Sequence, residues 1–229
     1  MSSAKRVLVI APHADDETLG VGGTIARFAA QGDEVHVAVI TGHGAEPHPL
    51  WPRSLWDTIR GEAQRAMKVL GAHTLHFEEI PAALVADIPV HQLNKTVGSL
   101  IAKIQPEILF VPFLNDLHKD HREIFHASSV AWRTSSPTGR NIKAVYCYEV
   151  QSETHWNAPY LEAGFTPNVW FDISSHLDTK LRALACFESQ IRPFPDARSI
   201  EAVRALATWR GSQQNMAAAE AFVCVRQLH

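Results

Sequence analysis

The chain has 229 residues, a length that fits one large α/β domain better than two complete ones, since domains average about 150 residues. Hydrophobic residues make up 46% of the sequence and charged residues 20%, which excludes a chain that is disordered throughout. The formal net charge is −3 and the sequence has no run of lysine or arginine, which argues against a protein that binds nucleic acid or an anionic membrane.

The first half of the chain alternates predicted strands with predicted helices. Strands are predicted at four short segments: 7–11, 35–40, 75–77 and 108–111. Helices are predicted at three segments with apolar residues at helical spacing: around 25–29, 55–70 and 90–104. Strand, helix and strand in close succession form a βαβ unit. We therefore expect an α/β fold with a Rossmann-like, mostly parallel sheet that helices cover on both faces.

The pattern changes after about residue 140. Strands are predicted at 145–150, 168–173 and 221–225, and helices at about 175–189 and 198–210. Neither an internal repeat nor a linker interrupts the sequence. We expect a single domain over residues 1–229, with an elaborated C-terminal half.

Cysteine usage and hydropathy indicate the compartment. Cys147, Cys186 and Cys224 are odd in number and far apart, which argues against a disulfide framework or a thiolate zinc cluster and favours a reducing environment. The apolar run at 7–11 is too short for the core of a signal peptide. Nothing approaches the roughly 20 apolar residues of a membrane span. We expect a cytoplasmic protein without a membrane span; its oligomeric state, a homo-oligomer included, stays open.

Two polar clusters follow predicted strands directly. The sequence PHADDE stands at 12–17, after the first strand, and NDLHKDH stands at 115–121, after the strand at 108–111. Ligands of open parallel sheets bind beyond the carboxyl ends of the strands. If these two strands are neighbours in the sheet, the fold brings both clusters to one site.

Together the clusters contain the groups of a hydrolytic metal site. Two imidazoles and a carboxylate make a three-ligand zinc site with an open position, and zinc lowers the pKa of a water molecule to about 7. A second carboxylate can act as general base, and the adjacent Asp15 and Asp16 supply both carboxylates. One histidine of the second cluster can bind the metal and the other can meet the substrate, with Asp120 holding its tautomer.

Each cluster taken alone has a simpler explanation. Histidines three residues apart at a helix start are often only solvated, and an acidic turn after a strand is often a helix N-cap. The metal site is the better interpretation because the two clusters complete one ligand set at the ends of two buried strands. Gly20, Gly22 and Gly23 lack the GxGxxG spacing and indicate close packing of a helix on the sheet.

At this point the sequence resembles the PIG-L/LmbE-like family of zinc-dependent N-deacetylases, which act on N-acylated amino sugars and their conjugates. The family pattern PHPDDE matches 12–17, with Ala14 where proline is usual, and DxHxDH matches 116–121. An Arg-x-Glu pattern matches 60–62. The resemblance implies that His13, Asp16 and His121 bind one zinc ion.

The resemblance also implies the remaining roles. Asp15 is the expected general base, and His118, oriented by Asp120, is expected to polarise the carbonyl group or to protonate the leaving amine. Arg60 is expected to contact substrate hydroxyls, with a solvent-facing helix charge as the alternative. The loop 41–56 is expected to border the site.

Two tryptophans of this loop, Trp51 and Trp56, could stack on a sugar ring. Further candidates for the pocket are His43, His48, His155 and Trp156. The predicted function is metal-dependent removal of an N-acyl group from a small amino sugar or its conjugate, with acetyl as the expected acyl group. Two alternatives stay open: a metal-dependent phosphoesterase, and a carbohydrate-binding relative that has lost catalysis.

Overall fold

The computed structural model describes residues 4–44 and 47–228, so residues 45 and 46 of the predicted loop 41–56 lie outside the described part. The strands are β1 (Arg6–Ala11), β2 (Glu34–Gly42), β3 (Thr74–Pro81), β4 (Ile108–Pro112), β5 (Ala144–Tyr148), β6 (Val169–Asp172) and β7 (Ala219–Gln227). The helices are α1 (Asp16–Ala30), α2 (Arg53–Leu70), the 3₁₀ turn η1 (Val85–Asp87), α3 (Val90–Ile104), α4 (Lys119–Ala131), α5 (Gln151–Thr154), α6 (Leu177–Leu184) and α7 (Ile200–Ser212).

All strands of this part belong to one sheet, in the order β3-β2-β1-β4-β5-β7-β6. The first five positions in that order are parallel, and β7 runs antiparallel to both β5 and β6. The predicted α/β fold with a mostly parallel sheet is therefore confirmed. The two polar clusters can form one site only if the strands that precede them are neighbours, and β1 and β4 are parallel neighbours in the sheet.

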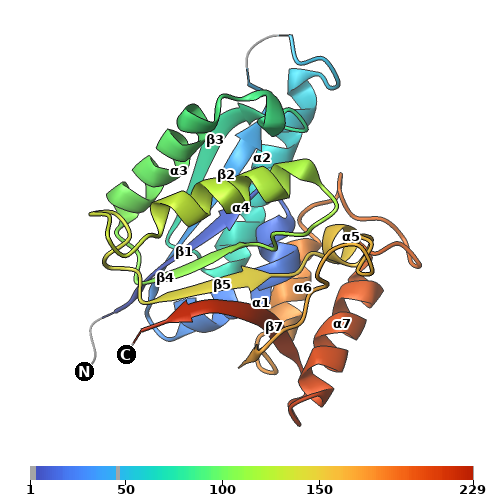
Figure 1. Cartoon of the computed structure of the whole chain (residues 1–229). Helices are drawn as coiled ribbons and strands as arrows, with labels where there is room; N and C mark the ends of the chain where they lie inside the picture. Colours follow the sequence, from blue (N-terminus) through green and yellow to red (C-terminus); the bar gives the residue numbers. More distant parts are fainter. Residues whose placement is uncertain (1–3, 45–46, 229) are drawn as a thin grey trace.

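Helices cover both faces of the sheet (Figure 1). α3 and α4 lie together on one face, and α1, α2 and α6 lie on the other. The alternation of side chains along β1 explains this arrangement, since Val7 and Val9 belong to one hydrophobic core and Leu8 and Ile10 to the other. A strand that buries both faces needs a continuous apolar sequence, which is the pattern at 7–11.

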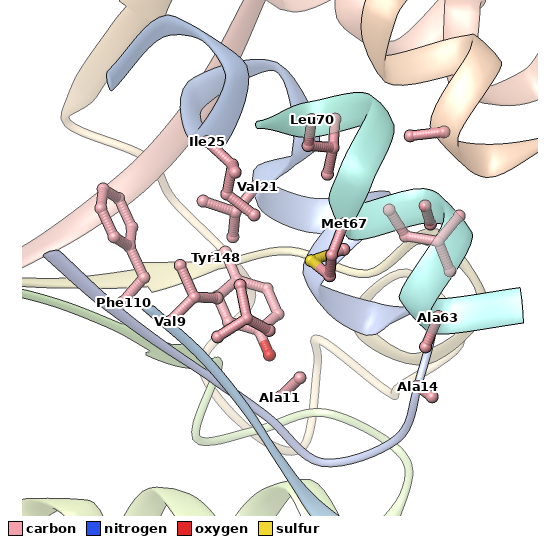
Figure 2. Close-up of a cluster of buried hydrophobic side chains, with 14 of the residues drawn as sticks. Val9, Ala11, Ala14, Val21, Ile25, Ala63, Met67, Leu70, Phe110 and Tyr148 are labelled. Carbon is pink, nitrogen blue, oxygen red and sulfur yellow. The ribbon is translucent and has the colours of Figure 1, made fainter. Parts of the chain in front are cut away.

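Figure 2 shows the first of these cores, where Val21 and Ile25 of α1 pack beside Val9 and Phe110 of the sheet. Tyr148 lies in the same core, and its hydroxyl donates a hydrogen bond to the carbonyl oxygen of Ile10 at 2.9 Å. This bond ties β5 to β1 near the end that carries the site.

The glycines of α1 allow that helix to approach its neighbours closely, as the sequence indicates. A Cβ atom on Gly20 would lie 2.4 Å from the ring of Tyr148, and one on Gly23 would lie 2.6 Å from Ile173. Such contacts are too short for any side chain. The position of α1, and with it the turn that precedes it, therefore depends on these glycines.

The second half differs in detail from the prediction. α4 was not predicted as a helix, because its buried face consists largely of small residues such as Ala127 and Ser128. The helix expected at 175–189 ends at Leu184. Over the described ranges, none of the helices combines the length and the apolar composition that crossing a membrane requires.

Candidate active site

The two polar clusters lie side by side at the carboxyl edge of the sheet, as expected from neighbouring β1 and β4. The candidate ligand atoms of His13, Asp16 and His121 all lie within 4.8 Å of one another. Nδ1 of His13 is 3.3 Å from Oδ2 of Asp16, and Nε2 of His121 is 3.2 Å from the same oxygen. The three side chains that the resemblance assigns to the metal therefore converge on one point.

The chemistry of this group fits a metal ion. Nε2 of His121 is buried, makes no well-directed hydrogen bond among the described residues, and lies 3.2 Å from Oδ2 of Asp16, an arrangement in which the two side chains could share a cation. Burial raises the pKa of Asp16, but the contacts with His121 and His13 together outweigh burial and hold the pKa well below its usual value. Asp16 is therefore ionised and could serve as an anionic metal ligand. Two imidazoles and one carboxylate leave an open coordination position on a zinc-type ion.

Asp116 orients His121 from the side opposite the other ligands. Its Oδ2 atom is hydrogen-bonded to Nδ1 of His121 at 2.8 Å, and its Oδ1 atom accepts a hydrogen bond from the hydroxyl of Thr154 at 2.6 Å. Both Asp116 and His121 are fully buried. A carboxylate on the far nitrogen of a ligand histidine fixes the ring and increases its basicity.

Asp120 makes the equivalent contact with the other ligand histidine. Its Oδ2 atom is 3.0 Å from Nε2 of His13 and accepts a hydrogen bond from the backbone N–H of Ala83 at 2.7 Å. Its Oδ1 atom accepts from the backbone N–H of Val85 at 3.3 Å. A second group of candidate ligands, His13, His118 and Asp120, also lies within 4.8 Å, but these hydrogen bonds already occupy the carboxylate of Asp120.

The orientation of His118 differs from the expectation. The carboxylate of Asp120 is 3.9 Å from Nδ1 of His118, too far for a hydrogen bond; the backbone N–H of Asp120 donates to that nitrogen instead, at 3.2 Å. The proton of the neutral ring is therefore on Nε2. Burial, together with the charge of His13, lowers the pKa of His118 to about 4, so the ring is neutral at neutral pH.

Asp15 has an unusual backbone conformation beside the ligands. It is the N-cap of α1 with φ 132° and ψ −27°, and its side chain makes no capping hydrogen bond. Such a conformation costs roughly 1–3 kcal/mol in a residue other than glycine. Burial and the negative charge of Asp16 raise the pKa of Asp15 to about 7, and the positive charge of Arg198, whose Nη1 is 3.7 Å from Oδ2 of Asp15, opposes this increase.

A cavity of about 350 Å³ opens at this group. Its lining includes three polar side chains of the two clusters, His13, Asp15 and His118. One wall is apolar and comes from α2 and the residues before it: Trp51, Leu55, Trp56 and Ile59. Another part of the lining, the polar wall, comes from the segment before α7: Ser189, Gln190, Arg192 and Arg198.

The polar wall is hydrogen-bonded to α2, the helix that carries most of the apolar wall. The buried carboxylate of Glu62, on α2, accepts hydrogen bonds from the backbone N–H of Ser189 at 2.8 Å and from its hydroxyl at 2.6 Å. Arg198 is held by Ser152 and Glu153 at 3.2 and 3.4 Å. Both walls therefore have defined anchors in the fold.

Arg60 lies outside the cavity lining. Arg60 forms an ion pair with Glu79 and lies over the ring of Phe77, with its guanidinium carbon 4.9 Å from the ring centroid. Its role in substrate contact stays a prediction. The two tryptophans, Trp51 and Trp56, do line the cavity.

The three further histidines are also absent from the lining. The rings of His43 and His48 lie 5.4 Å apart, centroid to centroid, and His155 is bound to Glu149 at 2.7 Å. Their contacts support neighbouring segments.

Removing the charge of Asp116 should weaken metal binding. Asparagine is uncharged and has a single side-chain oxygen, so either the hydroxyl of Thr154 or the ring of His121 loses its acceptor. Changes of this kind typically cost about 10–100-fold in metal affinity. Competition with a chromophoric chelator measures the affinity. Asp178→Ala, on an exposed side chain, is the control and should leave the affinity unchanged. Equal affinities for Asp116→Asn and wild type would contradict the orienting role of Asp116.

The fold and the site define a hydrolase with a His/Asp metal-binding group at the carboxyl edge of a parallel sheet. Residues 8–132 match the family described as PIG-L: GlcNAc-PI de-N-acetylase. The match covers more than half of the chain, and the chain belongs to this family of metal-dependent N-deacetylases.

Individual relatives agree with this membership. Diacetylchitobiose deacetylase from Thermococcus kodakarensis is 26% identical over 205 residues, which cover 85% of this chain and 72% of the relative. 4-Oxalmesaconate hydratase from Pseudomonas putida is 26% identical over 204 residues, covering 81% of this chain and 74% of the relative. The structure of N,N'-diacetylchitobiose deacetylase from Pyrococcus horikoshii has the same fold, with a TM-score of 0.76 at 22% identity, and covers 97% of this chain and 84% of that chain.

Proposed function

We propose that this protein hydrolyses the N-acetyl group of a small amino sugar or amino-sugar conjugate, with one zinc ion bound by His13, Asp16 and His121. The observation that carries the proposal is the two-histidine, one-carboxylate group in which Nδ1 of His13 and Nε2 of His121 both face Oδ2 of Asp16, at 3.3 and 3.2 Å. The cavity with Asp15 and His118 in its lining opens directly at this group. Zinc bound here supplies Lewis-acid chemistry and a lowered pKa of water.

The chain's own residues divide the proton transfers. Asp15, with a pKa of about 7, accepts a proton from the attacking water and can return it to the leaving nitrogen, which departs as an amine. Neutral His118 offers its Nε2–H to the carbonyl oxygen, where negative charge develops. Of the two roles expected for His118, its low pKa favours polarisation of the carbonyl group over protonation of the amine.

The cavity walls support a sugar as the substrate. A pyranose has an apolar face that packs on aromatic rings, which Trp51 and Trp56 provide. Its hydroxyls need hydrogen-bond partners, which Ser189, Gln190 and Arg192 of the polar wall provide. The proposal also places the enzyme in the cytoplasm, a location that three unpaired cysteines support.

The test measures acetate and primary amine released from N-acetylglucosamine and N,N'-diacetylchitobiose by the purified protein. We expect equal amounts of both products, loss of activity with a chelator, and recovery with Zn²⁺. Parallel assays follow the hydration of 4-oxalmesaconate, because one relative is a hydratase, and phosphate release from sugar phosphates. Amine release from neither sugar, with turnover in one of the parallel assays, would reject the deacetylase proposal.

A further inference from the structure

Glu17 is a fully buried carboxyl group in the first turn of α1. No basic side chain forms an ion pair with it within the described part of the chain, and Asp15 and Asp16 add two more carboxyl groups beside it. Its two oxygens accept one hydrogen bond each: Oε2 from the backbone N–H of Asp15 at 3.1 Å and Oε1 from the hydroxyl of Thr18 at 2.8 Å. A buried carboxyl group without a cation is costly, so its contacts require an explanation.

The hydrogen bond to Asp15 is similar to one half of a capping box, although Glu17 is the second residue of α1 and a capping box uses the third. In a capping box the side chain of the N-cap residue binds an N–H of the first turn, while an acidic side chain of that turn reaches back to the N-cap N–H. Here only the second half is present. Glu17 reaches back to the N-cap residue Asp15, whose own side chain makes no capping hydrogen bond.

The missing half has a consequence for Asp15. Because its carboxylate does not cap α1, it is available in the lining of the cavity, 3.7 Å from Arg198. Because Asp15 is the N-cap residue, its backbone N–H has no acceptor within α1, and Glu17 supplies one. Without that acceptor, a buried N–H would stay unpaired.

We propose that Glu17 is a positioning residue that holds Asp15 in its positive-φ conformation and thereby keeps the Asp15 carboxylate in the cavity instead of on the helix end. The inference rests on the proposed function in one respect, since the consequence for turnover assumes that Asp15 is the general base. The backbone part does not depend on the reaction.

The test compares two variants of similar length. Glu17→Met removes the acceptor, and Glu17→Gln retains an amide oxygen that can accept from Asp15. We expect Glu17→Met to lower kcat by roughly 10–10²-fold, the effect of misplacing a reacting group by about 1 Å, with unchanged KM and metal content. Glu17→Gln should recover most of the lost kcat. Glu17→Leu is the second apolar variant if methionine prevents folding.

Two further measurements separate positioning from general destabilisation. In the Asp15→Asn background, Glu17→Met should lower kcat little further, because the residue it positions is already inactive. A crystal structure of Glu17→Met should show Asp15 at a changed φ with its carboxylate turned toward the end of α1. Wild-type kcat in Glu17→Met, or an unchanged φ at Asp15, would overturn the inference. An inactive wild-type enzyme would instead reject the proposed function and leave the crystallographic test intact.

Discussion

Asp15→Asn should lower kcat by about 10²–10⁴-fold, the usual cost of losing a general base, while the protein retains its metal. Asparagine has nearly the same shape as aspartate and tolerates positive φ, so the strained turn at φ 132° should persist. The amide cannot accept the proton of water, and turnover should fall for that reason alone. Steady-state kinetics and metal analysis of the same preparation measure both quantities.

Asp16→Asn is the matched variant, one residue further along the chain. Asp16 lies 3.3 and 3.2 Å from the two histidines of the metal-binding group, so its loss should lower metal content first and activity as a consequence. If Asp15→Asn loses the metal and Asp16→Asn retains it, the assignment of the two carboxylates is reversed.

Arg210→Met should destabilise the protein by about 3–5 kcal/mol, because it leaves a buried carboxylate without its guanidinium partner. Arg210 on α7 donates two hydrogen bonds to Glu149, at 2.7 and 2.6 Å, and both side chains are only 5% exposed. Urea unfolding measures the loss. Arg204→Met on the same helix is the control, since its ion pair with Asp178 is exposed and should contribute less than about 1 kcal/mol.

The ion pair between Arg210 and Glu149 also makes the stability difference between wild type and Arg210→Met depend on pH. Burial raises the pKa of Glu149, but hydrogen bonds with His155 and Arg210 outweigh burial and hold the pKa below its ordinary 4.5. A lowered pKa means that the stabilisation is present above pH 4.5 and is lost as the pH falls through the folded-state value. The stability difference between wild type and Arg210→Met should therefore narrow in acid. A difference that grows in acid would contradict the ionised state of Glu149.

The sequence predicted the structure well where a local pattern of residue types meets one structural requirement. The strand at 7–11 needs apolar residues on both faces, and the two polar clusters directly follow strands, so the sheet and the meeting of His13, Asp16 and His121 could be predicted. The neighbouring positions of β1 and β4 were a condition of that prediction, and the structure meets it.

Contacts that depend on three-dimensional detail were not predictable. The carboxylate of Asp120 contacts His13 instead of His118, because the turn that begins α4 directs its backbone N–H to His118 and its side chain away. Arg198 reaches Asp15 across the cavity from a segment 183 residues further along, and no local pattern around it signals a site. The Asp116 contact with His121 could have been found, since the DxHxDH pattern already contains both residues.

The hydrogen bonds between Glu62 and Ser189 have a consequence for how this enzyme selects molecules. α2 carries most of the apolar wall of the cavity and, through Glu62, also holds Ser189 of the polar wall, so a shift of this helix would move both parts of the lining. The shape of the cavity therefore depends on the Glu62–Ser189 hydrogen bonds as well as on the side chains that line it. Replacing a side chain of either wall should change which ligands fit, whereas replacing Glu62 should change how the two walls are placed relative to each other.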